Sequence, residues 1–195
     1  MQKRQFKFVC LLAEHTKFSP LQPGTVFSIS IRVLCCSRYS HYSILMVDEV
    51  DGTYHVIEST WPEVKVKTYL EWYAHSDRLV LPQFLDQSIW PFDLEAVLAK
   101  EGEKYPVRDI VEQPLDIIRT NWVAIGHRWN GRSGIGRVGT FCTELVATGM
   151  GRADSFRIRP NDLYSPLGIV GITNGEEFRT YKGQEAVLPQ FLLYA

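Results

Sequence analysis

Cys142 is the residue whose sequence surroundings best suit a nucleophile. The segment from Thr140 to Gly149 predicts a short buried helix, with Thr140 as the N-cap, Glu144 in the first turn and Gly149 at the end. A cysteine in the first turn of a helix lies beside unpaired backbone N–H groups, which favour the thiolate and can also stabilise an oxyanion. The sequence therefore predicts a nucleophilic cysteine; the alternative is that Cys142 packs in the core beside Leu145.

A nucleophilic thiolate needs a base, and a predicted β-hairpin carries the candidate. Residues 40–47 and 54–60 are rich in β-forming side chains, and Asp51-Gly52 between them is a strong turn signal. In a hairpin, residues that lie opposite each other share a face of the sheet. The position of the turn therefore decides which side chains of the two strands meet.

His41 and Glu58 are the two residues that this hairpin is expected to bring together. The turn predicts that they lie opposite each other, so that Glu58 accepts a hydrogen bond from one imidazole nitrogen and leaves the other for Cys142. His55 is the competing orienting residue, but the same register places it on the opposite face. The three residues Cys142, His41 and Glu58 are thus the predicted catalytic triad.

Neither a metal site nor a cofactor site is expected. The stretch Gly134–Gly139 matches the G-x-G-x-x-G pattern, but residues 127–130 before it do not form the hydrophobic strand that a dinucleotide site requires. The cysteines show no C-x-x-C pair and no spacing to histidine that suits zinc. There are four of them: Cys10, Cys35, Cys36 and Cys142.

Size and charge limit the remaining possibilities. The chain has 195 residues, 45% of them hydrophobic, which predicts a single domain covering residues 1–195. The net charge of −1 disfavours nucleic-acid binding as the main role. The apolar stretches are too short for a membrane span, and the N-terminal segment lacks the features of a secretory signal, so a cytoplasmic location is expected.

The remaining pattern predicts a mixture of strands and helices. Beyond the hairpin, strands are expected over residues 6–13 and 78–81 and from Thr25 onward, and helices over residues 64–72, 92–100 and, more weakly, 110–122.

The order of these residues resembles that in the circularly permuted papain-like cysteine hydrolases, the YiiX-like branch of the NlpC-type superfamily, which is related to the lecithin:retinol acyltransferase group. The similarity runs from about residue 23 to about residue 164. It rests on Tyr39-Ser40-His41, Val56-Ile57-Glu58, Gly102-Glu103-Lys104-Tyr105, Phe141-Cys142-Thr143-Glu144-Leu145-Val146 and Arg159-Pro160-Asn161-Asp162-Leu163-Tyr164. Thr143 departs from the family's usual serine.

The resemblance implies a papain-like α+β fold, in which an antiparallel sheet or small barrel packs against helices and the nucleophile lies at a helix N-terminus. It also implies a cysteine hydrolase that cleaves an amide bond in a cell-wall peptide or in an N-acyl or lipid-linked amide, through an acyl-thioester. An acyltransferase on the same scaffold and a non-catalytic binding module that retains the groove are the alternatives. The expected partner is a small molecule or peptide with an amide or ester bond.

Overall fold

The described part of the chain is dominated by one antiparallel sheet. A computed structural model describes residues 5–16, 38–75, 77–105, 142–152 and 169–187, together with positions 163, 189 and 192. Seven strands in these residues pair in the order β4-β3-β2-β1-β5-β6, and β7 also pairs with β5. The strands are β1 (Phe6–Thr16), β2 (His41–Asp48), β3 (Tyr54–Ser59), β4 (Val64–Thr68), β5 (Arg78–Leu85), β6 (Ile172–Asn174) and β7 (Phe178–Thr180).

Three short helices accompany the sheet in the described residues. They are α2 (Tyr69–His75), α3 (Leu94–Leu98) and α5 (Cys142–Gly149), with seven, five and eight residues. The predicted α+β papain-like fold is therefore wrong, because the described architecture is a single antiparallel sheet and its helices are too few and too short to form a clear helical layer. The central strands β1, β2 and β3 are buried almost continuously, because both faces of the sheet are covered.

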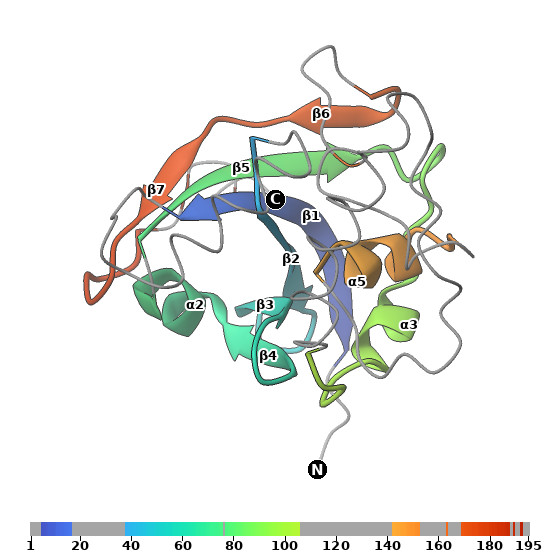
Figure 1. Cartoon of the computed structure of the whole chain (residues 1–195). Helices are drawn as coiled ribbons and strands as arrows, with labels where there is room; N and C mark the ends of the chain where they lie inside the picture. Colours follow the sequence, from blue (N-terminus) through green and yellow to red (C-terminus); the bar gives the residue numbers. More distant parts are fainter. Residues whose placement is uncertain are drawn as a thin grey trace, which may run out of the picture.

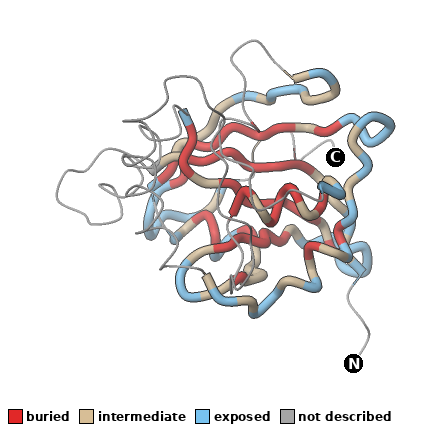
Figure 2. Tube along the Cα trace, turned by 45° about the vertical axis from the view of Figure 1, so that its right-hand side comes forward, coloured by how far each residue is buried: buried red, intermediate tan, exposed pale blue. Residues whose placement is uncertain are grey.

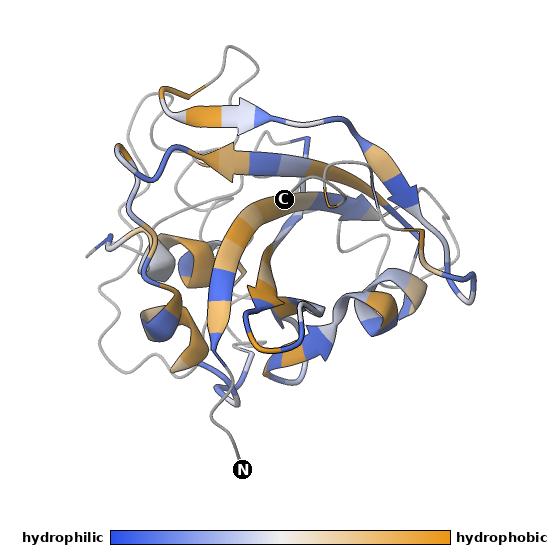
Figure 3. Ribbon diagram, turned by 180° about the vertical axis from the view of Figure 1, so that it is seen from behind, coloured by the Kyte–Doolittle hydropathy of each residue, from blue (hydrophilic) through white to orange (hydrophobic). Residues whose placement is uncertain are grey.

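The sheet curves strongly and buries side chains on both of its faces (Figure 1). Helices α3 and α5 lie on its convex side, whereas α2 lies at the concave side beside β4. Alternate residues of one strand belong to different cores: Leu11 and Ala13 pack in the convex-side core, and Cys10 and Leu12 pack in the concave-side core. Strand β1 is accordingly hydrophobic along much of its length (Figure 3), and its central residues are fully buried (Figure 2).

The segment over residues 64–72, predicted as one helix, is instead a strand followed by a helix. Val64 and Val66 alternate with Lys65 and Lys67, and this period of two fits β4, which pairs with β3. Helix α2 begins only at Tyr69. The predicted strand over residues 78–81 extends further, to Leu85, and the predicted helix over residues 92–100 is shorter, from Leu94 to Leu98.

The β2–β3 hairpin forms as predicted, but its register is shifted by two residues along β2. Glu58 pairs with Ser43 and not with His41. Gly52 takes up the turn with a φ of 72°, which a glycine adopts without strain. Because the shift moves Glu58 by two residues along β2, Glu58 and His41 still lie on the same face.

Helix α5 is fixed on the convex side of the sheet by close contacts at its C-terminal end. It packs against β2, β3 and α3. A Cβ atom on Gly149 would lie 2.2 Å from the ring of Phe92, so the ring occupies the space that any larger residue would need. The backbone N–H of Asp93 donates to the carbonyl of Gly149 at 2.7 Å. These contacts fix the position of the helix that carries Cys142.

Several of the predictions lie outside the described residues. They are the strand from Thr25, the helix over residues 110–122, the glycine stretch Gly134–Gly139, the N-cap Thr140, Phe141, and, apart from Leu163, the segment Arg159–Tyr164. None of the described helices has the length and hydropathy needed to cross a bilayer.

Candidate active site

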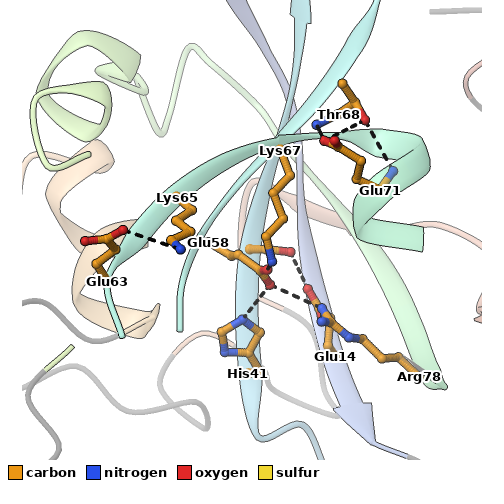
Figure 4. Close-up of polar contacts among 10 residues, drawn as sticks. Glu14, His41, Glu58, Glu63, Lys65, Lys67, Thr68, Glu71 and Arg78 are labelled. Atoms are coloured by element: carbon orange, nitrogen blue, oxygen red, sulfur yellow. Dashed lines mark hydrogen bonds and ion pairs between the residues drawn. The ribbon is translucent and has the colours of Figure 1, made fainter. Parts of the chain in front are cut away.

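His41 and Glu58 form an ion pair on the concave face of the sheet. Nε2 of His41 lies 3.5 Å from Oε2 of Glu58 (Figure 4). His41 is the first residue of β2, and Glu58 is the next-to-last residue of β3, so both side chains lie at the same end of the hairpin. The Glu58 side chain is fully buried, while 20% of the His41 side chain is exposed.

Cys142 is the first residue of α5, and its side chain lies close enough to His41 to raise the pKa of the imidazole. Since α5 packs on β2 and His41 begins that strand, the N-terminus of the helix meets the imidazole at the end of the sheet. Cys142 is 7% exposed. The structure thus brings together the three residues that the sequence predicts for the site, and their catalytic roles remain predictions.

Glu58 is held as a carboxylate by cations around it. Lys67 donates to its Oε1 at 2.5 Å, and Nη1 of Arg78 lies 3.3 Å from its Oε2. Burial raises the pKa of Glu58, but the close polar contact with His41 and the charges of Arg78, His41 and Lys67 outweigh that effect and lower the pKa far below its usual range. Glu58 is therefore ionised throughout the neutral pH range.

Glu14 is a second buried carboxylate beside His41, and sequence reasoning missed it. Its Oε2 forms an ion pair with Arg78, and its Oε1 accepts a hydrogen bond from the hydroxyl of Ser43. Glu14 pairs directly with His41 in the β1–β2 ladder. The sequence signal for this residue was its position in the strand. Glu14 lies on the same face of β1 as Cys10 and Leu12, and a charged side chain on a buried face needs a partner.

These surroundings determine the protonation state of His41. Burial lowers its pKa, but the charge and hydrogen bond of Cys142, the hydrogen bond to Glu58 and the charge of Glu14 outweigh this and raise the pKa to about 10. His41 is therefore an imidazolium at neutral pH. The two carboxylates beside the imidazolium are also matched by Arg78 and Lys67.

The same donor atoms bear on metal binding. One side-chain atom from each of Glu14, His41 and Glu58 lies within 4.8 Å of the other two. Carboxylates and an imidazole can bind divalent metals, but here the guanidinium of Arg78 bridges both carboxylates. A metal ion would have to displace that bridge, so the arrangement fits an ion-pair cluster better than a metal centre.

His55, the competing orienting residue, lies away from the dyad. It pairs with Met46, on the face opposite to that of His41. Its Nε2 is 2.9 Å from the hydroxyl of Thr53, and its ring packs edge-on against Phe6. It lines a separate groove at the sheet edge, of about 500 Å³, with Val66, Lys67, Thr68, Glu71, Leu98 and Glu101.

Tyr105 joins the site from the segment after α3. Burial and then the nearby charge of Cys142 raise the pKa of Tyr105, which keeps its hydroxyl protonated. Its backbone N–H donates to the carbonyl of Pro62 at 2.8 Å, beside Trp61, whose side chain is 74% exposed. The sequence resemblance included Tyr105 only as part of a motif, and its proximity to Cys142 depends on a fold contact between distant segments.

Comparison of the chain with protein-family models, with curated proteins and with solved structures finds no match to any of them.

Proposed function

We propose that the protein is a cysteine-dependent hydrolase that cleaves an amide bond through an acyl-thioester on Cys142. The observation that carries this proposal is the contact between Cys142, at the first position of α5, and His41, whose ring also faces a buried and ionised Glu58. Covalent acyl transfer requires a nucleophile that contacts a base, and a carboxylate that orients the base. Cys142, His41 and Glu58 are proposed for these three roles.

The proposed reaction follows from the two charged partners. The Cys142 thiolate attacks the carbonyl carbon of the amide, and the first backbone N–H groups of α5 stabilise the oxyanion. The imidazolium of His41 gives its proton to the departing amine as the C–N bond breaks, which leaves an acyl-thioester and a neutral imidazole. His41 then takes a proton from water, and the resulting hydroxide attacks the thioester carbonyl; the C–S bond breaks, the acid leaves, and the thiolate and imidazolium pair is restored.

The proposed substrates are a cell-wall peptide and an N-acyl or lipid-linked amide. Both classes present an amide carbonyl with an apolar or peptidic acyl group. An acyltransferase would use the same acyl-thioester and differ only in the acceptor. Adding a primary amine during turnover distinguishes the two, since an acyltransferase then forms the new amide in place of the free acid.

The test is direct detection of the acyl-enzyme. The full-length protein is mixed with peptidyl and long-chain N-acyl anilides, and the released aniline and the mass of the protein are followed together. We expect a burst of aniline and a mass increase on Cys142, both abolished in Cys142→Ala. The matched control is Cys10→Ala, because Cys10 is fully buried and burial raises the pKa of its thiol. Activity that persists in Cys142→Ala would contradict the proposal.

A further inference from the structure

We propose that Arg78 and Glu14 are positioning residues for His41: Arg78 keeps Glu14 away from the imidazole and leaves Glu58 as the carboxylate that faces it. This proposal rests on the proposed function, because it concerns the same Cys142–His41 pair. It assigns a role to two residues from β1 and β5 that lie outside the predicted triad.

Two carboxylates compete for one imidazole at this site. Glu14 pairs with His41 in the β1–β2 ladder, and Glu58 reaches His41 diagonally from β3. Both carboxylates have an oxygen within 4.8 Å of a ring nitrogen of His41. Without a further constraint, either of them can form the ion pair that fixes the ring.

Arg78 resolves this competition through its position. Its Nη1 forms an ion pair with Oε2 of Glu14 and lies 3.3 Å from Oε2 of Glu58, the same oxygen that faces His41 (Figure 4). The hydroxyl of Ser43 occupies the other oxygen of Glu14. Both oxygens of Glu14 are therefore engaged by groups other than His41, whereas Oε2 of Glu58, at 3.3 Å from Arg78, also faces the imidazole at 3.5 Å.

The position of Arg78 is itself well supported. Its side chain is only 8% exposed, and its guanidinium lies 5.4 Å from the centre of the ring of the fully buried Trp72 in α2. Lys67 holds the other oxygen of Glu58 from β4. The cluster therefore alternates cations and anions across five strands, and His41 lies on the central strand of the five.

Removal of Arg78 has two consequences that follow from charge alone. Glu14 and Glu58 become like charges at close range, and Glu14 is released to bind His41. The imidazole then turns toward β1 and away from the geometry that serves Cys142. Neutralising Glu14 at the same time removes both effects, so the double variant Glu14→Gln with Arg78→Met should function better than Arg78→Met alone.

The experiment uses iodoacetamide, which alkylates a cysteine thiolate without the need for a natural substrate. The rate of alkylation of Cys142 is measured by mass spectrometry from pH 4 to pH 10, together with the ¹⁵N shifts of the His41 ring. We expect Arg78→Met to slow alkylation at pH 6 by about tenfold or more and to move the profile to higher pH. Arg78→Lys should recover part of the rate, and the double variant most of it. Arg179→Met, an exposed arginine on β7, is the matched control.

The outcomes separate this role from the proposed function. If Arg78→Met folds and keeps the wild-type alkylation profile, the positioning role is wrong while the hydrolase proposal stands. If Arg78→Met fails to fold, the double variant decides: a wild-type profile supports the competition between carboxylates, and a profile displaced to higher pH overturns it. Amide hydrolysis that persists in Cys142→Ala overturns the proposed function. The alkylation rates still decide whether Arg78 positions His41 beside Cys142.

Discussion

The imidazole of His41 and the carboxylate of Glu58 face each other diagonally across the β2–β3 ladder, with 3.5 Å between Nε2 and Oε2. A diagonal neighbour needs a longer side chain than a directly opposed one, and glutamate supplies that length. The pair also lies between Cys142 on one side and Arg78 on the other. Any change in this contact is therefore expected to alter the chemistry of the thiol.

The protonation of His41 is expected to depend on Cys142. In the wild-type protein the imidazolium should persist until the pH approaches about 10. In Cys142→Ala the charge and hydrogen bond of the thiol are lost, and the pKa of His41 should fall toward its ordinary value of 6.5 because burial then opposes the imidazolium. Titration of the ¹⁵N shifts of the ring measures both values. Equal pKa values in the two proteins would exclude the thiolate and imidazolium pair.

Replacement of Glu58 should lower stability in a way that depends on pH. The folded-state pKa of Glu58 lies below its ordinary value of 4.5, so its contribution is complete above that pH and declines as the pH falls further. Glu58→Gln leaves Arg78 and Lys67 without their shared carboxylate, at a cost of about 3 kcal/mol at pH 7. Urea unfolding at pH 7 and pH 3 should show a smaller difference from wild type at pH 3.

Substitution of Glu58 should reduce the rate of catalysis more than substitution of His55. Glu58→Gln should slow formation of the acyl-enzyme, and Glu58→Ala should slow it further by freeing the imidazole ring. His55→Ala should change the rate far less, because His55 lies on the opposite face and contacts Thr53 and Phe6. Burst kinetics of the three variants measure the rates. If the His55 and Glu58 variants lose the same fraction of the acylation rate, Glu58 is not the residue that orients His41.

Trp61 is expected to contact the acyl group of the substrate. Its side chain is 74% exposed, and the next residue, Pro62, accepts a hydrogen bond from the backbone of Tyr105, whose side chain is close to Cys142. Trp61→Ala should raise KM for long-chain or aromatic acyl anilides by about tenfold and leave kcat nearly unchanged. Leu70→Ala is the control, since Leu70 is similarly exposed on α2. Unchanged KM values for Trp61→Ala would contradict this assignment.

The sequence predicts the local elements of the site better than the architecture around it. The β-forming residues and the Asp51-Gly52 turn suffice to predict the hairpin, and the shared face of His41 and Glu58 survives a register error because side chains repeat every two residues. Glu14 and Arg78 could not be paired from the sequence, since they are 64 residues apart and meet only when β1 and β5 become neighbours. The papain-like fold was inferred from motifs that describe only the residues near the chemistry.

The strand order has a consequence for how the chain folds. Arg78 is the first residue of β5, and it pairs with Thr180 of β7. Thr180 is near the opposite end of the sequence from Glu14. A partly folded chain that has joined β1, β2 and β3 but not yet β5 holds two acidic side chains on its inner face without the guanidinium that compensates them. Burial of such charges is unfavourable, so this intermediate should be sparsely populated. The cluster that prepares the thiol therefore also couples the early hairpin to β5, and thiol reactivity becomes a reporter of the docking of that strand.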